Sequence, residues 1–154
     1  MDYGSQIRKC RSFLKDHDVG VIATATYDGE PHASVVNYFA NDKFEVFFIA
    51  RDRAQKFKNI MSNPRASFVI ADPTFAMSLE IEGDAFKLED TEETVNLLSQ
   101  LAAVVRRKNA GPLPIMRHPG SELHLFCLKA GHLTYADFRP TYDEGEYFEV
   151  DVEK

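Results

Sequence analysis

The chain has 154 residues, of which 44% are hydrophobic and 27% are charged, and its formal net charge is −6 at pH 7. Such a composition is typical of one globular domain with a substantial core, and it excludes a long disordered segment. The acidic excess argues against general nucleic-acid binding, which needs many Lys and Arg side chains to neutralise phosphates.

The sequence shows neither a membrane span nor a secretion signal. Its apolar runs are shorter than a bilayer requires, and residues 6–15 alternate charged and apolar side chains in a helical pattern. We therefore expect a cytoplasmic location. Cys10 and Cys127 stand far apart and in no metal-ligand spacing. We expect both to be reduced core residues, with a reactive thiol as the alternative.

The first half of the chain predicts a helix followed by an antiparallel meander. Ser5 can cap the helix, whose apolar face repeats at Ile7, Cys10 and Leu14. Three strands then follow, joined by a two-residue hairpin at Asp28-Gly29 and by a second turn at Asn41-Asp42. Their expected ranges are residues 21–27, 31–40 and 44–50.

The most distinctive segment follows the third strand. A short helix opens with Arg51, Arg53 and Lys56 on a chain that is otherwise acidic; Asp52 and Gln55 have the spacing of a capping box, and residue 64 ends the helix. The free N–H groups and positive dipole of a helix start can hold a phosphate, and a neighbouring cation adds a charge-assisted contact. The alternative is a solvated helix face above an inward row of Phe57, Ile60 and Met61.

The second half predicts two more strands and a longer helix. Residues 66–70 are expected to form the fourth strand, and residues 77–85 alternate between apolar and polar side chains. Phe86 breaks this alternation just after Gly83, which predicts a bulge or a bend in the strand. The glutamates of that alternation are expected on a solvated or dimer-facing surface. Asp90 and Glu93 form a capping box for a helix that runs to about residue 108. The apolar face of this helix is Leu98, Leu101, Ala102 and Val105.

The remaining residues complete a mainly β domain with peripheral helices. A Pro- and Gly-rich loop over residues 109–120 precedes two last strands, 122–129 and 132–138, joined at Ala130-Gly131. About seven strands linked by short hairpins favour an antiparallel barrel. We assign residues 1–140 to one domain and residues 141–154 to a mobile acidic tail.

Catalytic groups of the protein itself are not indicated. No serine lies in a Gly-x-Ser-x-Gly elbow, neither cysteine has a local signature, and no two of the five histidines have metal-ligand spacing. A barrel with one cationic corner instead suits a phosphorylated cofactor whose own ring carries the difficult chemistry.

Three segments together resemble the pyridoxamine 5'-phosphate oxidase-like, FMN-binding split-barrel superfamily. They are residues 29–38, residues 47–68 and residues 79–85, and they occur in the order and spacing of that superfamily. The resemblance covers roughly residues 7–90, and residues 133–138 look like the closing strand that many members carry. It implies an antiparallel split β-barrel that forms a homodimer with FMN at the subunit interface.

The resemblance also implies roles for individual residues. The strand from Ser34 to Asn37 would run beside the flavin, the strand end at Ile49 and Ala50 would approach it, and Lys56 would bind the phosphate. Ser78 matches a position that can contact the isoalloxazine ring. The complete set of expected cofactor-binding residues is Ser34, Val35, Val36, Asn37, Ile49, Ala50, Arg51, Arg53, Gln55, Lys56 and Ser78.

Several residues depart from the superfamily pattern, and these departures bear on how the phosphate is bound and on which reactions are expected. Ala50 and Ala54 stand where members carry small hydroxyl residues, and Gln55 stands where an Arg is frequent. Phosphate binding would therefore depend on Lys56 with help from Arg51 or Arg53. Ser34 replaces an Arg of the true oxidase, and its C-terminal Arg-x-His-x-Arg signature is missing, which argues against pyridoxamine phosphate oxidation. The histidine typical of nitroimidazole-reductase-like members is missing near residue 49 as well.

Two classes of function remain open at this point. The first is an FMN-dependent oxidoreductase that leaves one ring face open to a reductant or to a small oxidisable substrate. The second is a binding or electron-carrier module of the same fold that holds FMN or haem, and a deazaflavin-dependent reductase is a third option. A haem would need an axial ligand. The candidates are His32, His118, His124 and His132.

Overall fold

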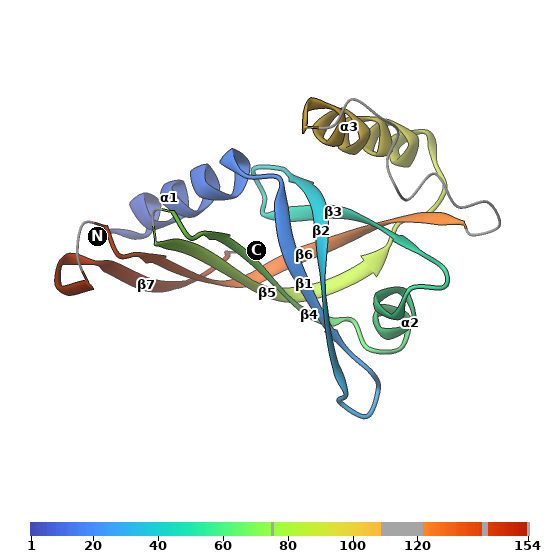
Figure 1. The fold of residues 1–154 in the computed structure, drawn as a ribbon, viewed down its shortest axis with the longest axis horizontal. Coiled ribbons are helices and arrows are strands. Elements are labelled where there is room, and N and C mark those ends of the chain that lie inside the picture. Colours follow the sequence, from blue (N-terminus) through green and yellow to red (C-terminus); the bar gives the residue numbers. More distant parts are fainter. Residues whose placement is uncertain (75, 109–121, 140–141, 154) are drawn as a thin grey trace.

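A computed structural model describes residues 1–74, 76–108, 122–139 and 142–153. Within these residues seven antiparallel strands have the spatial order β3-β2-β1-β4-β5-β6-β7, and β3 also pairs with β6. The extra pairing closes β1 to β6 into a six-stranded barrel, and β7 extends the sheet beyond β6 (Figure 1). The strands are β1 (Val19–Ala25), β2 (Pro31–Ala40), β3 (Glu45–Arg51), β4 (Arg65–Asp72), β5 (Met77–Lys87), β6 (Leu123–Asp137) and β7 (Glu146–Asp151).

Three α-helices of the described residues lie around the barrel, as the sequence predicts. They are α1 (Tyr3–Asp16), α2 (Gln55–Ser62) and α3 (Glu92–Lys108), and a 3-10 turn, η2 (Tyr142–Glu144), precedes β7. Figure 1 shows α1 and α3 above the sheet in that view and α2 at its lower right, beside the β1–β2 hairpin. No helix of the described residues is long and apolar enough to cross a bilayer.

Strand β6 corrects the prediction of two separate C-terminal strands. It runs without a break over 15 residues, because the sheet register shifts between Glu82 and Gly83 and absorbs Gly131 as an extra residue. Gly83 pairs with Ala130 at this bulge, and a Cβ added to Gly83 would lie 1.9 Å from the carbonyl oxygen of Lys129. The predicted irregularity at Gly83 is therefore confirmed, and its cause is the close approach of two backbones.

The first hairpin differs from the predicted two-residue turn, whereas the second turn lies at the predicted place, after Ala40. The β1–β2 loop has three residues, because Thr26 N–H donates to Glu30 at 2.9 Å and Gly29 takes the left-handed conformation with φ 93°. This is the geometry of a type I turn followed by a G1 bulge. In the β2–β3 turn Phe44 has φ 59°, and its side chain is only 2% exposed. Burial of that ring offsets the cost of a conformation that a bulky residue rarely adopts.

The helix caps lie one or more residues from their predicted places. Asp2 caps α1, since its carboxylate accepts from the Ser5 N–H at 2.8 Å, so Ser5 is the recipient of the cap. Thr91, which follows the predicted Asp90, accepts from the Thr94 N–H at the start of α3. The predicted inward face of α1, at Ile7, Cys10 and Leu14, is buried as expected.

The acidic C-terminal segment forms β7 and does not extend freely. Residues 146–151 pair with β6 in register, from Glu146 opposite Asp137 to Asp151 opposite His132. Val150 and Phe148 pack against the barrel core on their inner side. Alternation of apolar and acidic residues therefore marks an edge strand here, because one face is buried while the acidic face stays in solvent.

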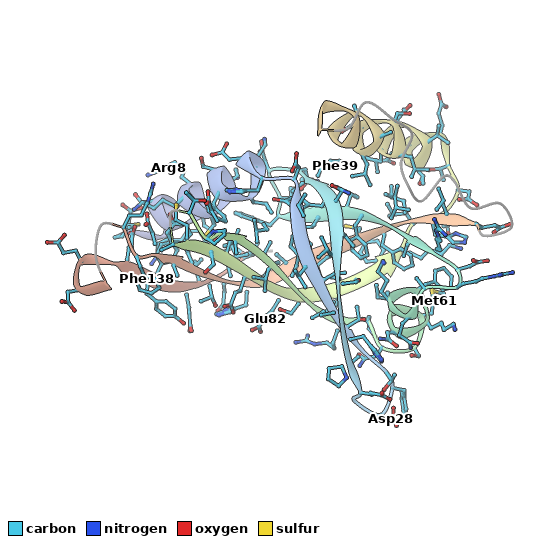
Figure 2. All side chains as sticks on the ribbon, viewed as in Figure 1. Arg8, Asp28, Phe39, Met61, Glu82 and Phe138 are labelled. Carbon is cyan, nitrogen blue, oxygen red and sulfur yellow. The ribbon has the colours of Figure 1, made fainter. Side chains whose placement is uncertain are left out.

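Two apolar clusters stabilise the fold. The larger fills the barrel and includes Phe48, Phe68 and Phe126, and the smaller lies under α3 and includes Phe47, Ile49 and Leu101. Figure 2 shows Phe39 beside α3, in agreement with its packing against the smaller cluster.

Both cysteines belong to these clusters as free thiols, which confirms their core assignment. Burial raises the pKa of Cys10 and of Cys127 to about 12, so both thiols stay protonated at neutral pH.

Candidate functional site

The cationic corner lies where β3 ends and α2 begins. Ala54 occupies the N-cap position of α2 and no side chain caps the helix, so the predicted capping box of Asp52 and Gln55 is wrong. Asp52 lies two residues too early, and its backbone N–H donates to the carbonyl of Glu122 at 3.2 Å as an extension of the β3–β6 pairing. The uncapped first turn of α2 therefore leaves backbone N–H groups that can donate hydrogen bonds to an anion.

Lys56 is the central cation of this corner. Its side chain is half-buried, and burial lowers its pKa, with the positive charge of Arg51 adding to the effect. Within the described part of the chain no carboxylate lies within ion-pair distance of Lys56. Arg53, between them in sequence, is exposed. A half-buried lysine at an uncapped helix start, with an arginine near it, is an arrangement that a phosphate would stabilise.

The inward face of α2 is more polar than the sequence pattern predicts. Ile60 is buried and Phe57 packs against the barrel cluster, but Met61 is 59% exposed and points away from the barrel (Figure 2). Asn59, which lies between Phe57 and Ile60 in the sequence, is more deeply buried, with an exposed fraction of 1%. The solvated-face alternative thus accounts for only part of this helix.

A chain of polar groups connects α2 to the β1–β2 hairpin. The Asn59 side-chain Nδ2 donates to Thr24 Oγ1 at 3.0 Å and lies 3.1 Å from His32 Nδ1, while Gln55 Nε2 donates to Asn59 Oδ1 at 2.8 Å. Sequence analysis missed Thr24 and Asn59 because 35 residues separate them in the chain. A buried amide facing a buried hydroxyl can be found only from the tertiary structure.

Two further polar groups lie near the corner, in residues that the sequence offered for other roles: Asp52 as a helix cap and His124 as a haem ligand. Asp52 Oδ1 and His124 Nδ1 are buried and have no hydrogen-bond partner among the residues that the structure describes. His124 pairs with Ala50 across β3 and β6, and its ring lies 5.1 Å from that of Phe57 on α2. Buried polar atoms without partners are costly, so this corner has spare capacity for the polar atoms of a ligand.

The predicted flavin-side strand presents two different faces. Ser34 and Val36 alternate toward the barrel with the buried Tyr38, whereas Val35 and Asn37 face outward and Val35 is 70% exposed. Val35 lies opposite Val21 of β1. The expected residues of β2 thus lie on one strand, with their side chains divided between its two faces.

Three other predicted residues are distributed around the barrel. Ala50 is fully buried in the barrel cluster and Ile49 is 8% exposed in the cluster under α3, so any contact of theirs with a cofactor would use backbone atoms. Ser78 lies near the start of β5, and the far end of β5 is the one that meets the residues after α2, through Ala85 N–H and the Pro64 carbonyl. Within one chain Ser78 is therefore not brought to the Lys56 corner.

The described histidines do not form a metal centre, and no group of three metal-binding side chains is found among the described residues. His132 lies on the surface beside β7, where Asp151 raises its pKa through a 2.7 Å contact. His32 belongs to the polar chain under α2. His118 lies outside the described residues. Of the haem-ligand candidates, His124 is the one that combines burial with a partnerless nitrogen at the cationic corner.

Grooves elsewhere on the monomer do not include this corner. The most spacious of three, about 1070 Å³, lies among α1, the β2–β3 turn and the β5–β6 bulge, and none of the three is lined by Lys56.

A closed six-stranded antiparallel barrel with peripheral helices and a cationic strand-to-helix corner defines the class of split-barrel proteins. Residues 7–124 match the family model described as pyridoxamine 5'-phosphate oxidase. The chain belongs to this family. The resemblance inferred from the sequence and the fold class are confirmed.

Solved structures give the same fold at low sequence identity. An FMN-binding, pyridoxamine 5'-phosphate oxidase-related protein of Nostoc punctiforme is 14% identical over 100% of this chain and 98% of its own, with a TM-score of 0.61. HutZ, a haem storage protein of Vibrio cholerae, is 21% identical over 84% of this chain and 91% of its own, with a TM-score of 0.62. A haem-binding protein of Mycobacterium smegmatis is 19% identical over 96% of this chain and 59% of its own, with a TM-score of 0.67. No curated protein matches the sequence.

Proposed function

We propose that the protein is a cytoplasmic flavoprotein that binds FMN at the interface of a homodimer and acts as an oxidoreductase on a small molecule. The observation that carries the proposal is the pair of cations, Lys56 and Arg51, at the uncapped start of α2. Family membership and the FMN-binding relative from Nostoc punctiforme support the choice of ligand. The two buried free thiols suit a reducing compartment.

Each group at the corner would make a different contact with the cofactor. Lys56 would donate to the phosphate, Arg51 or Arg53 would balance its remaining charge, and backbone groups of residues 35–37 would hydrogen-bond the ring and tune its potential. FMN would supply the redox chemistry through its own ring system. The protein's task is then to hold and orient the flavin, and no side chain is assigned a catalytic role.

A second copy of the chain would complete the site. Val19, Val21 and Val35 are exposed on the outer face of β1 and β2, and Val35 lies opposite Val21 in the register. An apolar strip on a sheet is what a protein partner covers. Ser78, which lies away from Lys56 in one chain, could then reach the flavin from the other subunit of a C2 dimer.

The haem alternative is supported by one specific feature. His124 is buried, has a partnerless Nδ1 and lies at the cationic corner, and two structural neighbours are a haem-binding and a haem storage protein. The other ring nitrogen, Nε2, lies 3.7 Å from the exposed carboxylate of Glu122, which a haem iron on that nitrogen would have to displace.

The absorbance spectrum of the purified protein tests these proposals. We expect flavin bands, either as isolated or after addition of FMN, and quenching of FMN fluorescence on titration. Reduction by NADH or NADPH under anaerobic conditions would then separate an enzyme from a passive carrier. A Soret band that His124→Leu removes would favour haem. A protein that takes up neither group would refute both.

The dimer proposal has its own variant. We expect Val35→Asp to convert a dimer to a monomer, because a carboxylate would be buried in the apolar strip without a partner. Val95→Asp is the matched control, since Val95 is 60% exposed on α3. Light scattering after size-exclusion chromatography measures the mass of each. A monomeric parent, or equal masses for both variants, would contradict the assignment of this face.

A further inference from the structure

The polar chain under α2 links a titratable ring to the first turn of the helix. It runs from His32 on β2 through Asn59 to Gln55, with Thr24 of β1 as a side branch. Asn59 is 1% exposed and Thr24 4% exposed, so neither can replace a lost partner with bulk water. Gln55 is exposed and precedes Lys56 directly. The orientation of each amide therefore fixes that of the next.

When the neutral His32 ring carries its proton on Nε2, the hydrogen bonds of this polar chain run in one direction. His32 Nδ1 accepts from Asn59 Nδ2, which leaves Asn59 Oδ1 to accept from Gln55 Nε2. The other end of the Gln55 carboxamide, Oε1, then faces away from Asn59. An outward carbonyl oxygen on the first turn of α2 repels an anion, because both are hydrogen-bond acceptors.

Protonation of His32 reverses every member of the chain. Nδ1 becomes a donor, so Asn59 must turn over and present Oδ1 to it, and the Thr24 hydroxyl can donate to the same oxygen. Asn59 Nδ2 then donates to Gln55 Oε1, and Gln55 Nε2 turns outward. All partners are satisfied in both states, which makes the chain a two-state element.

We propose that His32 and Asn59 are positioning residues for the phosphate, and that a proton on His32 turns the Gln55 carboxamide from an acceptor to a donor toward it. This inference rests on the proposed function, because the phosphate it describes is that of FMN. Glu30 Oε1 lies 4.0 Å from His32 Nε2, while the groups that contact the ring from α2 and neighbour it from β1 are uncharged. Since histidine titrates between about pH 5 and 8, phosphate binding becomes tighter toward the acid end.

Side-chain NMR of the flavin-free protein tests the chain directly. We expect the Gln55 and Asn59 side-chain amide resonances to shift with the same midpoint as the His32 ring between pH 5 and 8. Gln55 resonances that stay constant while His32 titrates would overturn the proposal. This measurement needs no flavin. Failure of the protein to bind FMN would therefore refute the proposed function, and the NMR titration would still test whether His32, Asn59 and Gln55 reorient together.

Binding measurements test the consequence. The affinity for FMN, relative to riboflavin, should rise about tenfold from pH 8.0 to pH 5.5, the size expected for one hydrogen bond to a charged group. In His32→Gln only the change due to the phosphate's own titration should remain. His132→Gln is the control, since His132 pairs with Asp151 on the outer sheet, and it should keep the parent profile. Equal pH profiles for the parent and His32→Gln would overturn the proposal.

Discussion

Replacement of Lys56 by alanine is expected to weaken FMN binding by about 10- to 100-fold, the equivalent of one charged hydrogen bond of about 1.5–3 kcal/mol. The lysine is half-buried beside Arg51 at the uncapped start of α2, so its charge is little screened by water. Fluorescence titration with FMN gives the dissociation constant. Riboflavin, which lacks the phosphate, should bind the parent and the variant alike.

The matched control for this prediction is Lys58→Ala, because Lys58 is an exposed lysine on the same helix. Its removal changes the net charge equally and should leave FMN affinity within about twofold of the parent, as a surface charge screened by salt does. If both variants lose affinity equally, the effect is one of overall charge and Lys56 is not the phosphate ligand.

The unliganded protein should tolerate the loss of Lys56. Burial and Arg51 lower the pKa of the lysine, which means that its charged form is less favourable in the folded chain than in the unfolded chain. The stability of the unliganded parent therefore increases as the pH rises through that lowered pKa toward 10.5, and a bound anion reverses the penalty. A variant that melts near the parent but binds FMN poorly would separate a binding role from a structural one.

The sequence predicted the features that depend on local periodicity. The strict alternation of residues 77–85 corresponds to β5, where buried and exposed side chains alternate from Leu79 to Ala85. Period-two burial follows from strand geometry alone, so it can be read without knowing the neighbouring strands. The apolar face of α1 was predictable for the same reason, with the helical period in place of the strand period.

Features that depend on distant partners were not predictable. Asp52 has the spacing of a capping residue, but its backbone pairs with Glu122, and that pairing places the helix start at Ala54. The contact of Asn59 with Thr24 likewise joins two positions 35 residues apart. Candidate binding residues could be chosen from the superfamily resemblance, whereas the groups that orient them depend on how α2 lies against β1 and β2.

The break predicted between two C-terminal strands was wrong for a related reason. Ala130-Gly131 has the composition of a turn, yet β6 continues through it because Gly131 becomes the extra residue of a bulge beside Glu82 and Gly83 of β5. A bulge is a property of two strands, and one strand's sequence shows only that a small residue is present. The same bulge identifies Gly83 as a position where a larger residue would meet the backbone of the neighbouring strand.

Gly83→Ala is expected to lower the free energy of unfolding by about 3 kcal/mol or more, which is at the upper end of the cost of overpacking. The added Cβ would lie 1.9 Å from the Lys129 carbonyl oxygen and 2.9 Å from its carbonyl carbon. Both are backbone atoms of a central strand and cannot move aside as a flexible side chain does. In a domain of this size the melting temperature should fall by about 10 °C, measurable by thermal or urea denaturation.

Gly131→Ala tests whether the cost arises from the bulge contact itself. Gly131 is the extra residue on the opposite strand, and the nearest atom to its added Cβ is the Glu82 carbonyl oxygen at 3.7 Å, an ordinary van der Waals distance. This variant should stay within about 0.5 kcal/mol of the parent, as exposed substitutions do. If the two variants are equally unstable, the loss of either glycine of the bulge is the cause. The close approach of β5 and β6 at Gly83 would then not explain the instability of Gly83→Ala.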